Sequence, residues 1–246
     1  ALPICYPRAD DFKLADIDGD GDVDIVTRLG SGPASDAAGP AVWCENLGFG
    51  TNFVQHTIGN SLAYVKDIVV ADFDRDGRRD VAMRMDGQTQ LWLREANGAW
   101  TEVLLDHPAH EGLEAGDLDM DGDPDLILNG FWFPTPDTPA AARVAANYTY
   151  RVIDGAWFNQ GGDWTADSCK VVLGDFDGDG TNDAAFSQSE RAGYAVAWYR
   201  SATPHGGGPW VKHNVAVVHY CHNLQAADWD LGCDVDLLVG GLIQSQ

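Results

Sequence analysis

The chain has 246 residues and a formal net charge of -23, which comes from 38 acidic and 15 basic residues. So acidic a surface repels nucleic acid and anionic membranes, because both bind to patches of lysine and arginine. Neither is expected as a partner. Apolar residues make up 45% of the chain, enough to bury a sizeable core. No apolar run is long enough to predict a membrane-spanning helix.

The aspartates are concentrated in a repeated pattern, D-x-D-x-D-G-x-x-D. Intact copies cover residues 16–24, 72–80, 117–125 and 175–183, and an eroded copy covers residues 228–236. Because the copies start at a nearly constant spacing of 45 to 58 residues, they mark an internal repeat. Each copy therefore belongs to one structural unit.

Short apolar stretches flank every copy, and turn residues separate them. In the first unit these stretches are 24–26, 42–43 and 53–54, and in the second they are 68–71, 81–83, 91–93 and 100–103. The third unit has 125–128 and 156–158, the fourth has 171–174, 197–199 and 210–211, and the fifth has 223–227 and 236–239. Apolar runs this short between Gly, Asn and Asp turns predict β-strands, about four in each unit.

Four short strands in every repeat are typical of the blades of a β-propeller. One blade cannot cover its own faces, so neighbouring blades must stack. We therefore interpret the tryptophans that recur at the third strand as packing between blades, namely Trp43, Trp92, Trp157 and Trp198. The prediction is an all-β fold in which residues 1–246 form a single β-propeller domain or part of one. It has four full blades and part of a fifth, with units that start near residues 8, 64, 109, 167 and 220.

The four aspartate patterns and the phrase at residues 42–48 resemble the integrin-type propeller repeats called FG-GAP or VCBS repeats. The resemblance implies that each aspartate loop joins the first and second strands of a blade and holds one cation. Propellers of this family usually have seven blades. The chain is then a fragment of such a ring, a portion of a longer protein, or a smaller ring.

Calcium is the expected cation, because it takes six to eight oxygen ligands in a flexible shell. Side chains at positions 1, 3, 5 and 9 supply carboxylates, and position 7 supplies a backbone carbonyl. The predicted carboxylate ligands are Asp16, Asp18, Asp20, Asp24, Asp72, Asp74, Asp76, Asp80, Asp117, Asp119, Asp121, Asp125, Asp175, Asp177, Asp179 and Asp183. The predicted carbonyl ligands are those of Asp22, Arg78, Asp123 and Thr181. About four Ca²⁺ ions are therefore expected.

Single residues of the pattern exclude an EF-hand and show which copy of the loop is defective. An EF-hand needs a glutamate at position 12, and position 12 is Thr27, Met83, Leu128 or Phe186 in the four intact copies. The eroded copy has Gly232 and Cys233 at positions 5 and 6. Weak calcium binding or none is expected there. Because calcium is plentiful outside cells, we expect the chain to be secreted or displayed at the cell surface.

The loops on the face opposite to the calcium loops are the expected recognition surface. Candidate catalytic residues there are His110, His222, Tyr220, Lys66 and Arg8, and candidate ligand-binding residues are His219, Asn223, Trp132 and Arg143. Histidine and tyrosine can exchange protons with a substrate. The segment 219–223 reads equally well as a tight turn. We also predict that His110 and His222 line one central pocket.

Three functions fit this surface. The leading hypothesis is a non-catalytic binding module whose ligand is a carbohydrate or another cell-surface ligand. The first alternative is a lyase-like enzyme that acts on glycans containing uronic acid, and the second is a protein–protein adhesion module. The long insert at residues 129–154, rich in proline and aromatic residues, fits either a specificity loop or a pad against a neighbour. Five cysteines allow one or two disulfides, with at least one thiol left over.

Overall fold

The computed structural model of the chain describes residues 11–29, 38–48, 50, 52–61, 63–85, 87–108, 111–158, 164–201, 203, 208–232 and 234–241. The chain separates into two compact units. One comprises Ala1–His107 and Pro136–Tyr148, and the other comprises Pro108–Thr135 and Thr149–Gln246. Two candidate catalytic residues, Arg8 and His110, lie outside the described residues.

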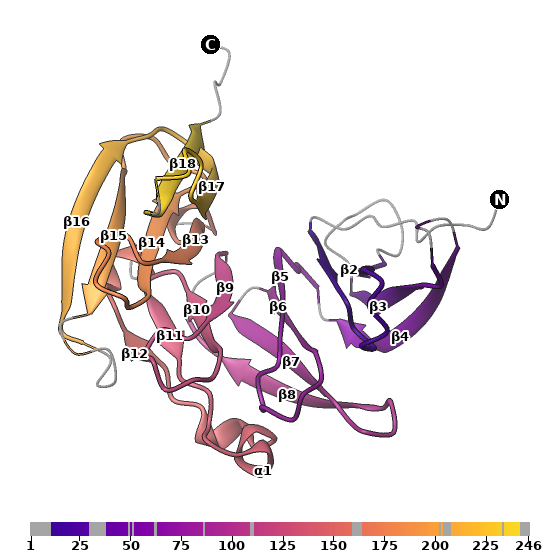
Figure 1. Cartoon of the computed structure of the whole chain (residues 1–246). Coiled ribbons are helices and arrows are strands. Elements are labelled where there is room, and N and C mark those ends of the chain that lie inside the picture. Colours follow the sequence, from indigo (N-terminus) through magenta and orange to yellow (C-terminus); the bar gives the residue numbers. More distant parts are fainter. Residues whose placement is uncertain are drawn as a thin grey trace. The chain divides into compact units, whose positions relative to one another are not determined.

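The first unit contains two four-stranded antiparallel sheets, each made of strands that are consecutive in the chain (Figure 1). The strands of one sheet are β1 (Phe12–Ala15), β2 (Asp24–Arg28), β3 (Gly39–Asn46) and β4 (Phe53–Ser61). The strands of the other are β5 (Asp67–Ala71), β6 (Asp80–Met85), β7 (Gln88–Arg94) and β8 (Trp100–Asp106). The short helix α1 (Pro139–Ala142) and the 3-10 helix η1 (Ala145–Asn147) complete this unit.

The second unit contains two further four-stranded sheets and one two-stranded sheet. The first comprises β9 (Leu113–Gly116), β10 (Asp125–Leu128), β11 (Phe131–Phe133) and β12 (Arg151–Val152). The second comprises β13 (Cys169–Gly174), β14 (Asp183–Gln188), β15 (Ala195–Ser201) and β16 (Trp210–Val217). The two-stranded sheet pairs β17 (Cys221–Ala227) with β18 (Asp236–Gly241), and the 3-10 helices are η2 (Gly155–Trp157) and η3 (Trp164–Ala166). The predicted all-β fold of four-stranded, propeller-like blades is confirmed.

The strands differ in burial according to their place in a sheet. The second strands β6 and β14 are buried along their whole length, as expected for strands covered on both faces, which read as continuous apolar runs. The outermost strand β16 is largely exposed. Buried second strands are therefore rigid supports for the loops that lead into them.

The third blade corrects one predicted strand. Its third strand is β11, not residues 156–158, which lie in and just after the helix η2. In the register of this sheet Trp132 lies opposite Ile127, two residues after the last aspartate of the pattern. Trp43 lies opposite Val26 in the same way. In the third blade, Trp132 therefore takes the strand position that the pattern assigned to Trp157.

Both units have cores in which the recurring tryptophans are buried. Trp43 and Trp92 pack with Ile17 in the first unit. Trp132 and Trp157 pack in one cluster of the second unit, and Trp198 is partly buried against another. The predicted packing role of these side chains is therefore supported. Polar side chains of the fourth strands cover the outer rings: His56 stacks on Trp43 at 4.5 Å and His213 stacks on Trp198 at 4.0 Å between ring centroids.

Two further findings concern covalent structure and membranes. Cys44 is disulfide-bonded, whereas Cys169 and Cys221 are buried free thiols. In the part of the chain that the structure describes, no helix reaches the length and apolarity that a bilayer span requires.

Candidate metal centres

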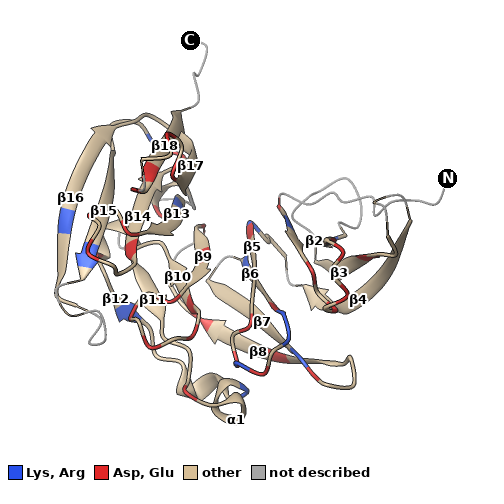
Figure 2. Cartoon of the chain, in the orientation of Figure 1, with Lys and Arg blue, Asp and Glu red and all other residues tan. Residues whose placement is uncertain are grey.

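Every aspartate pattern joins the first two strands of a sheet. Its first aspartate directly follows the first strand, and its ninth residue begins the second strand. The residue pairs that close these turns are Ala15–Asp24, Ala71–Asp80, Gly116–Asp125, Gly174–Asp183 and Ala227–Asp236. Acidic residues accordingly gather at the turns between first and second strands (Figure 2). The loop position that the resemblance implied is therefore the observed one.

The first aspartate of each intact loop shapes the backbone. Asp16 Oδ2 accepts a hydrogen bond from the Gly21 N–H at 3.0 Å. The same bond joins Asp72 to Gly77, Asp117 to Gly122 and Asp175 to Gly180, at 2.9 to 3.1 Å. Gly21 has a φ of 94°, a conformation that residues with a Cβ rarely adopt. The glycine at position 6 is therefore required by the turn.

The ninth residue ties the loop to the sheet. Asp24 Oδ2 accepts from the Ile17 N–H at 2.9 Å, and its Oδ1 accepts from the Asn46 N–H on the third strand at 2.8 Å. Asp80 and Asp125 are held in the same way by one N–H group of the loop and one from beyond it. The side chains of Ile17, Phe73 and Leu118 at position 2 are buried. These three loops are thus each fixed by a core residue of their own.

Carboxylate oxygens converge in all five copies of the pattern. In each copy one oxygen from positions 1, 3 and 9 lies within 4.8 Å of the other two. The triads are Asp16–Asp18–Asp24, Asp72–Asp74–Asp80, Asp117–Asp119–Asp125, Asp175–Asp177–Asp183 and Asp228–Asp230–Asp236. The eroded copy therefore keeps a triad, although Asp228 is only partly buried and Asp230 is exposed.

The predicted ligands at positions 5 and 7 bond to each other. Each position-5 carboxylate accepts from the position-7 N–H at 2.8 to 3.1 Å. The pairs are Asp20–Asp22, Asp76–Arg78, Asp121–Asp123 and Asp179–Thr181. This bond closes the tip of the loop beside the triad. The second carboxylate oxygen of Asp20, Asp121 or Asp179 could complete a metal shell, whereas Asp76 Oδ2 is paired with Arg78 Nη2.

Burial makes these carboxylates costly to ionise without a cation. Burial, aided by repulsion from the other carboxylates of the loop, raises the pKa of Asp80 to about 7, that of Asp125 to about 8 and that of Asp183 to about 7. The same causes raise the pKa of Asp119 to about 6. A bound cation would reverse both effects, because it attracts the ionised form.

Two buried oxygens also fit a metal ion. Asp119 Oδ1 and Asp183 Oδ1 are shielded from solvent and have no hydrogen-bond partner among the described residues. Buried polar atoms are normally satisfied, so an orphan oxygen calls for a ligand. An all-carboxylate oxygen set suits a hard divalent cation such as calcium. The residues of these loops therefore fit the predicted ion.

Two arginines that the sequence analysis did not predict as part of these centres lie beside the aspartate loops. Arg200 Nη1 is 2.8 Å from Asp177 Oδ2, and Arg94 Nη1 donates to the Ile17 carbonyl at 2.7 Å. Each of these arginines stands two residues after a third-strand tryptophan. This offset could have identified them from the sequence. Arg143, a predicted ligand-binding residue, instead lies at the second loop, where its Nη1 is 2.6 Å from Asp74 Oδ2.

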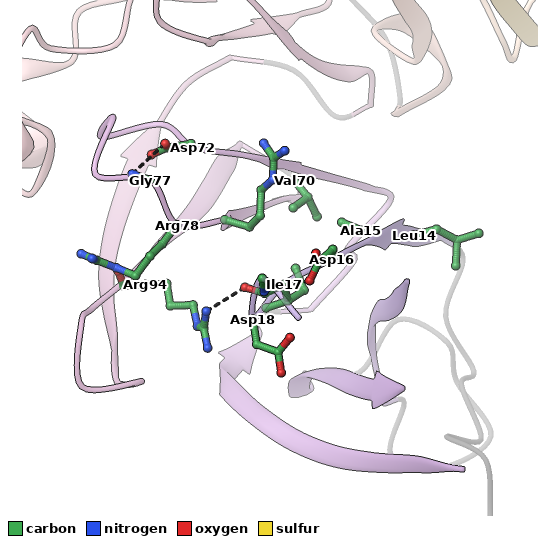
Figure 3. A pocket seen from close by; sticks show the side chains of 12 residues that line it. Leu14, Ala15, Asp16, Ile17, Asp18, Val70, Asp72, Gly77, Arg78 and Arg94 are labelled. Carbon is green, nitrogen blue, oxygen red and sulfur yellow. Dashed lines mark hydrogen bonds between the residues drawn. The ribbon is translucent and has the colours of Figure 1, made fainter. Parts of the chain in front are cut away.

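A cavity of about 610 Å³ lies in the first unit between its two aspartate loops (Figure 3). Asp16 and Asp18 of the first loop and Arg78 and Arg79 of the second contribute polar groups to its wall. Apolar atoms come from residues such as Leu14. The side chain of Arg79 is exposed. The cavity thus offers hydrogen-bond donors and acceptors close together.

In the second unit, residues 219–220 form a turn and residues 221–223 begin strand β17. Tyr220 has a φ of 51° and its N–H donates to the Arg191 carbonyl at 3.0 Å. His219 Nδ1 accepts from the Gly193 N–H at 3.0 Å. His222 Nε2 lies 3.3 Å from Glu190 Oε1. These contacts match the turn interpretation of the segment.

Three other candidate residues are placed as follows. Asn223 is exposed on β17. Lys66 belongs to the first unit, and its N–H donates to the Arg84 carbonyl at 3.0 Å. Trp132 is fully buried, with the Arg151 guanidinium 5.1 Å from its ring centroid. Its expected role in ligand binding is corrected, because no face of the ring is open to a sugar. Of the two residues predicted to line one pocket, His110 lies outside the described residues, whereas His222 lies on β17.

Comparison with known proteins agrees with this architecture. Residues 16–83 and 72–128 match the sequence model of the FG-GAP-like repeat. Among solved structures, the chain resembles an Agrocybe aegerita lectin that specifically recognises non-reducing terminal N-acetylglucosamine, with a TM-score of 0.51 and 15% identity. The likeness covers 81% of this chain and 50% of the lectin chain. Thus the chain spans half the length of that structure, and the shared feature is the fold. No curated protein matches the chain. With its repeated aspartate loops and four-stranded blades, the chain contains FG-GAP-like repeats over residues 16–128.

Proposed function

We propose that the chain is a secreted, calcium-stabilised β-propeller module that binds carbohydrate. The observation that carries the calcium part is the convergence of three carboxylates at every copy of the pattern. The orphan buried oxygens of Asp119 and Asp183 support the same assignment. Calcium at these loops would neutralise carboxylates that otherwise repel one another. Its role is structural, because each loop joins two strands of one sheet.

Carbohydrate is the ligand class that the cavity of the first unit fits best. A sugar hydroxyl accepts from a guanidinium, which the cavity wall offers at Arg79, and donates to a carboxylate oxygen of Asp16 or Asp18 beside the proposed calcium ion of the first loop. Apolar atoms such as those of Leu14 suit the C–H face of a sugar ring. The lectin with the related fold supports the same class of ligand. Since terminal N-acetylglucosamine is what that lectin recognises, it is the first sugar to test.

The test is a glycan array probed with the chain in millimolar calcium. We expect binding to glycans that end in N-acetylglucosamine. Arg79→Ala should weaken it by about tenfold, which corresponds to one lost charge-assisted hydrogen bond of about 1.4 kcal/mol. The matched control is Arg191→Ala, since Arg191 belongs to the second unit.

Two results would contradict the proposal. If no glycan binds, or if Arg79→Ala binds as the unaltered chain does, the cavity is not a sugar site. Ultraviolet-absorbing, unsaturated products released from uronic-acid polymers would instead favour the lyase alternative. The array and the absorbance assay therefore separate a binding module from an enzyme.

A further inference from the structure

The Arg143 guanidinium contacts two carboxylates of the second aspartate loop and a third carboxylate beside it. Its Nη1 lies 2.6 Å from Asp74 Oδ2, and its Nη2 lies 3.8 Å from Asp76 Oδ2. On its other edge, Nε and Nη2 donate to the two carboxylate oxygens of Glu95 at 3.1 and 3.2 Å. Fork-to-fork pairing of this kind fixes the direction of a guanidinium. The positive charge is thereby aimed into the second loop.

The segment around Arg143 holds the guanidinium in this place. Arg143 caps the C-terminal end of α1, and its Nη1 also donates to the Pro139 carbonyl at 2.5 Å. The buried Tyr148 hydroxyl donates to the Ala142 carbonyl at 3.0 Å. From the loop itself, Arg75 Nη2 donates to the Asp137 carbonyl at 2.5 Å. The segment 136–148 is thus attached to the second loop from both sides.

The second loop differs from the other intact loops in its charge. It contains Arg75, Arg78 and Arg79, whereas 16–24, 117–125 and 175–183 contain no basic residue. The arginines beside two of the other loops are more exposed, although Arg200 Nη1 also lies 2.8 Å from Asp177 Oδ2. Arg151 Nη1 is 3.8 Å from Asp119 Oδ2, and its side chain is 45% exposed. The side chain of Arg200 is 46% exposed, compared with 24% for Arg143. The second loop therefore has the largest positive charge near its triad.

A calcium ion at this triad would meet the guanidinium at close range. Calcium lies about 2.3 to 2.6 Å from its oxygen ligands, and Nη1 already lies 2.6 Å from Asp74 Oδ2. The side chain of Asp74 is 0% exposed, so solvent screens the repulsion between the two cations only weakly. Asp74 Oδ2 therefore cannot bind a calcium ion and the Arg143 guanidinium as strongly as it would bind either one alone.

We propose that the Arg143 guanidinium is the resident cation of the second loop and competes with calcium for Asp74 and Asp76. This inference rests on the proposed binding of calcium at the other intact loops. The second loop is then the weakest of the four intact sites. Filling it at high calcium detaches the segment 136–148, which makes this loop a sensor of calcium concentration.

The experiment is a calorimetric titration of the calcium-free chain with calcium chloride. For the unaltered chain we expect three tight sites and one site that is at least tenfold weaker. Arg143→Met removes the charge and keeps most of the side-chain length, so the weak site should tighten at least tenfold. Arg200→Met is the matched control, and it should change its own site less than threefold.

A second measurement follows the segment directly. Hydrogen exchange at the backbone amides of Ala142, Val144, Asn147 and Tyr148 should rise at least tenfold when calcium goes from micromolar to the millimolar range. These amides are hydrogen-bonded within the segment. Glu95→Gln loosens Arg143 without removing a loop carboxylate, so it should also tighten the weak site. Glu95→Gln therefore replaces Arg143→Met in the titration if Arg143→Met does not fold.

The outcomes separate this inference from the proposed function. Four equal sites that neither Arg143→Met nor Glu95→Gln alters would overturn the role of Arg143 and leave calcium binding intact. Weaker calcium binding in either variant would also overturn it, because the guanidinium would then support the ion. If no loop binds calcium, both the inference and the calcium part of the proposed function fail.

Discussion

Removing calcium with EDTA is expected to lower the thermal midpoint of the chain by roughly 15 °C or more. A ligand that binds only the folded state adds about 2.7 kcal/mol per site when its free concentration is about 100 times Kd. For a chain of this size, each kcal/mol shifts the midpoint by about 2 to 4 °C. Three filled loops therefore give a large shift. Emptying them leaves buried carboxylates such as Asp125 and Asp183 without a counter-charge.

Differential scanning calorimetry with calcium, with EDTA, and with EDTA followed by excess calcium measures this effect. The third sample excludes irreversible damage, because added calcium should restore the first curve. Magnesium in place of calcium should restore it only in part, since magnesium demands a smaller octahedral shell than these loops offer. Coincident curves with calcium and with EDTA would show that the loops hold no stabilising ion.

Replacing Gly130 by alanine is expected to destabilise the second unit by about 3 to 4 kcal/mol. Gly130 has a φ of 85°, and a Cβ on it would clash with the Asp154 carbonyl oxygen and would lie 2.7 Å from Trp157 Cβ. The Gly130 carbonyl accepts from the N–H groups of Ile153 and Asp154 at 2.8 and 3.0 Å. The backbone of Asp154, which would have to move to make room for the Cβ, is therefore hydrogen-bonded to Gly130 itself.

Gly98 provides the matched control for this substitution. It has nearly the same backbone conformation, with a φ of 82°, but nothing lies within 4 Å of a Cβ placed on it. Gly98→Ala should therefore cost only the backbone strain, about 1 kcal/mol. Urea unfolding of both variants compares the two. Equal losses of unfolding free energy would mean that the close approach at Gly130 is relieved at no cost.

The aspartate loops could be predicted from the sequence because everything that shapes them is local. Asp16 bonds to Gly21, five residues away, and Asp24 bonds to Ile17, seven residues away. Spacing along the chain therefore determines which carboxylates meet. The second and fourth blades could be predicted for the same reason, because their strands pair in the order in which they follow one another along the chain.

The third blade could not be predicted in this way, because its third and fourth strands are separated by a long excursion. Trp132 and Trp157 both fit the tryptophan position, and only pairing of β10 with β11 distinguishes them. Likewise, Arg143 reaches Asp74 across 69 residues of chain. Contacts between distant residues depend on packing, which spacing does not encode.

The central claim, that the aspartate loops bind calcium, is tested most directly by counting ions. Equilibrium dialysis against millimolar calcium, followed by metal analysis, should find about four ions per chain. Asp119→Asn should lose one of them, because Asp119 is a buried member of its triad. Asp230→Asn, at the same position of the exposed eroded loop, should lose none or a weakly held one. Less than one calcium ion per chain, or an unchanged count in Asp119→Asn, would contradict the account.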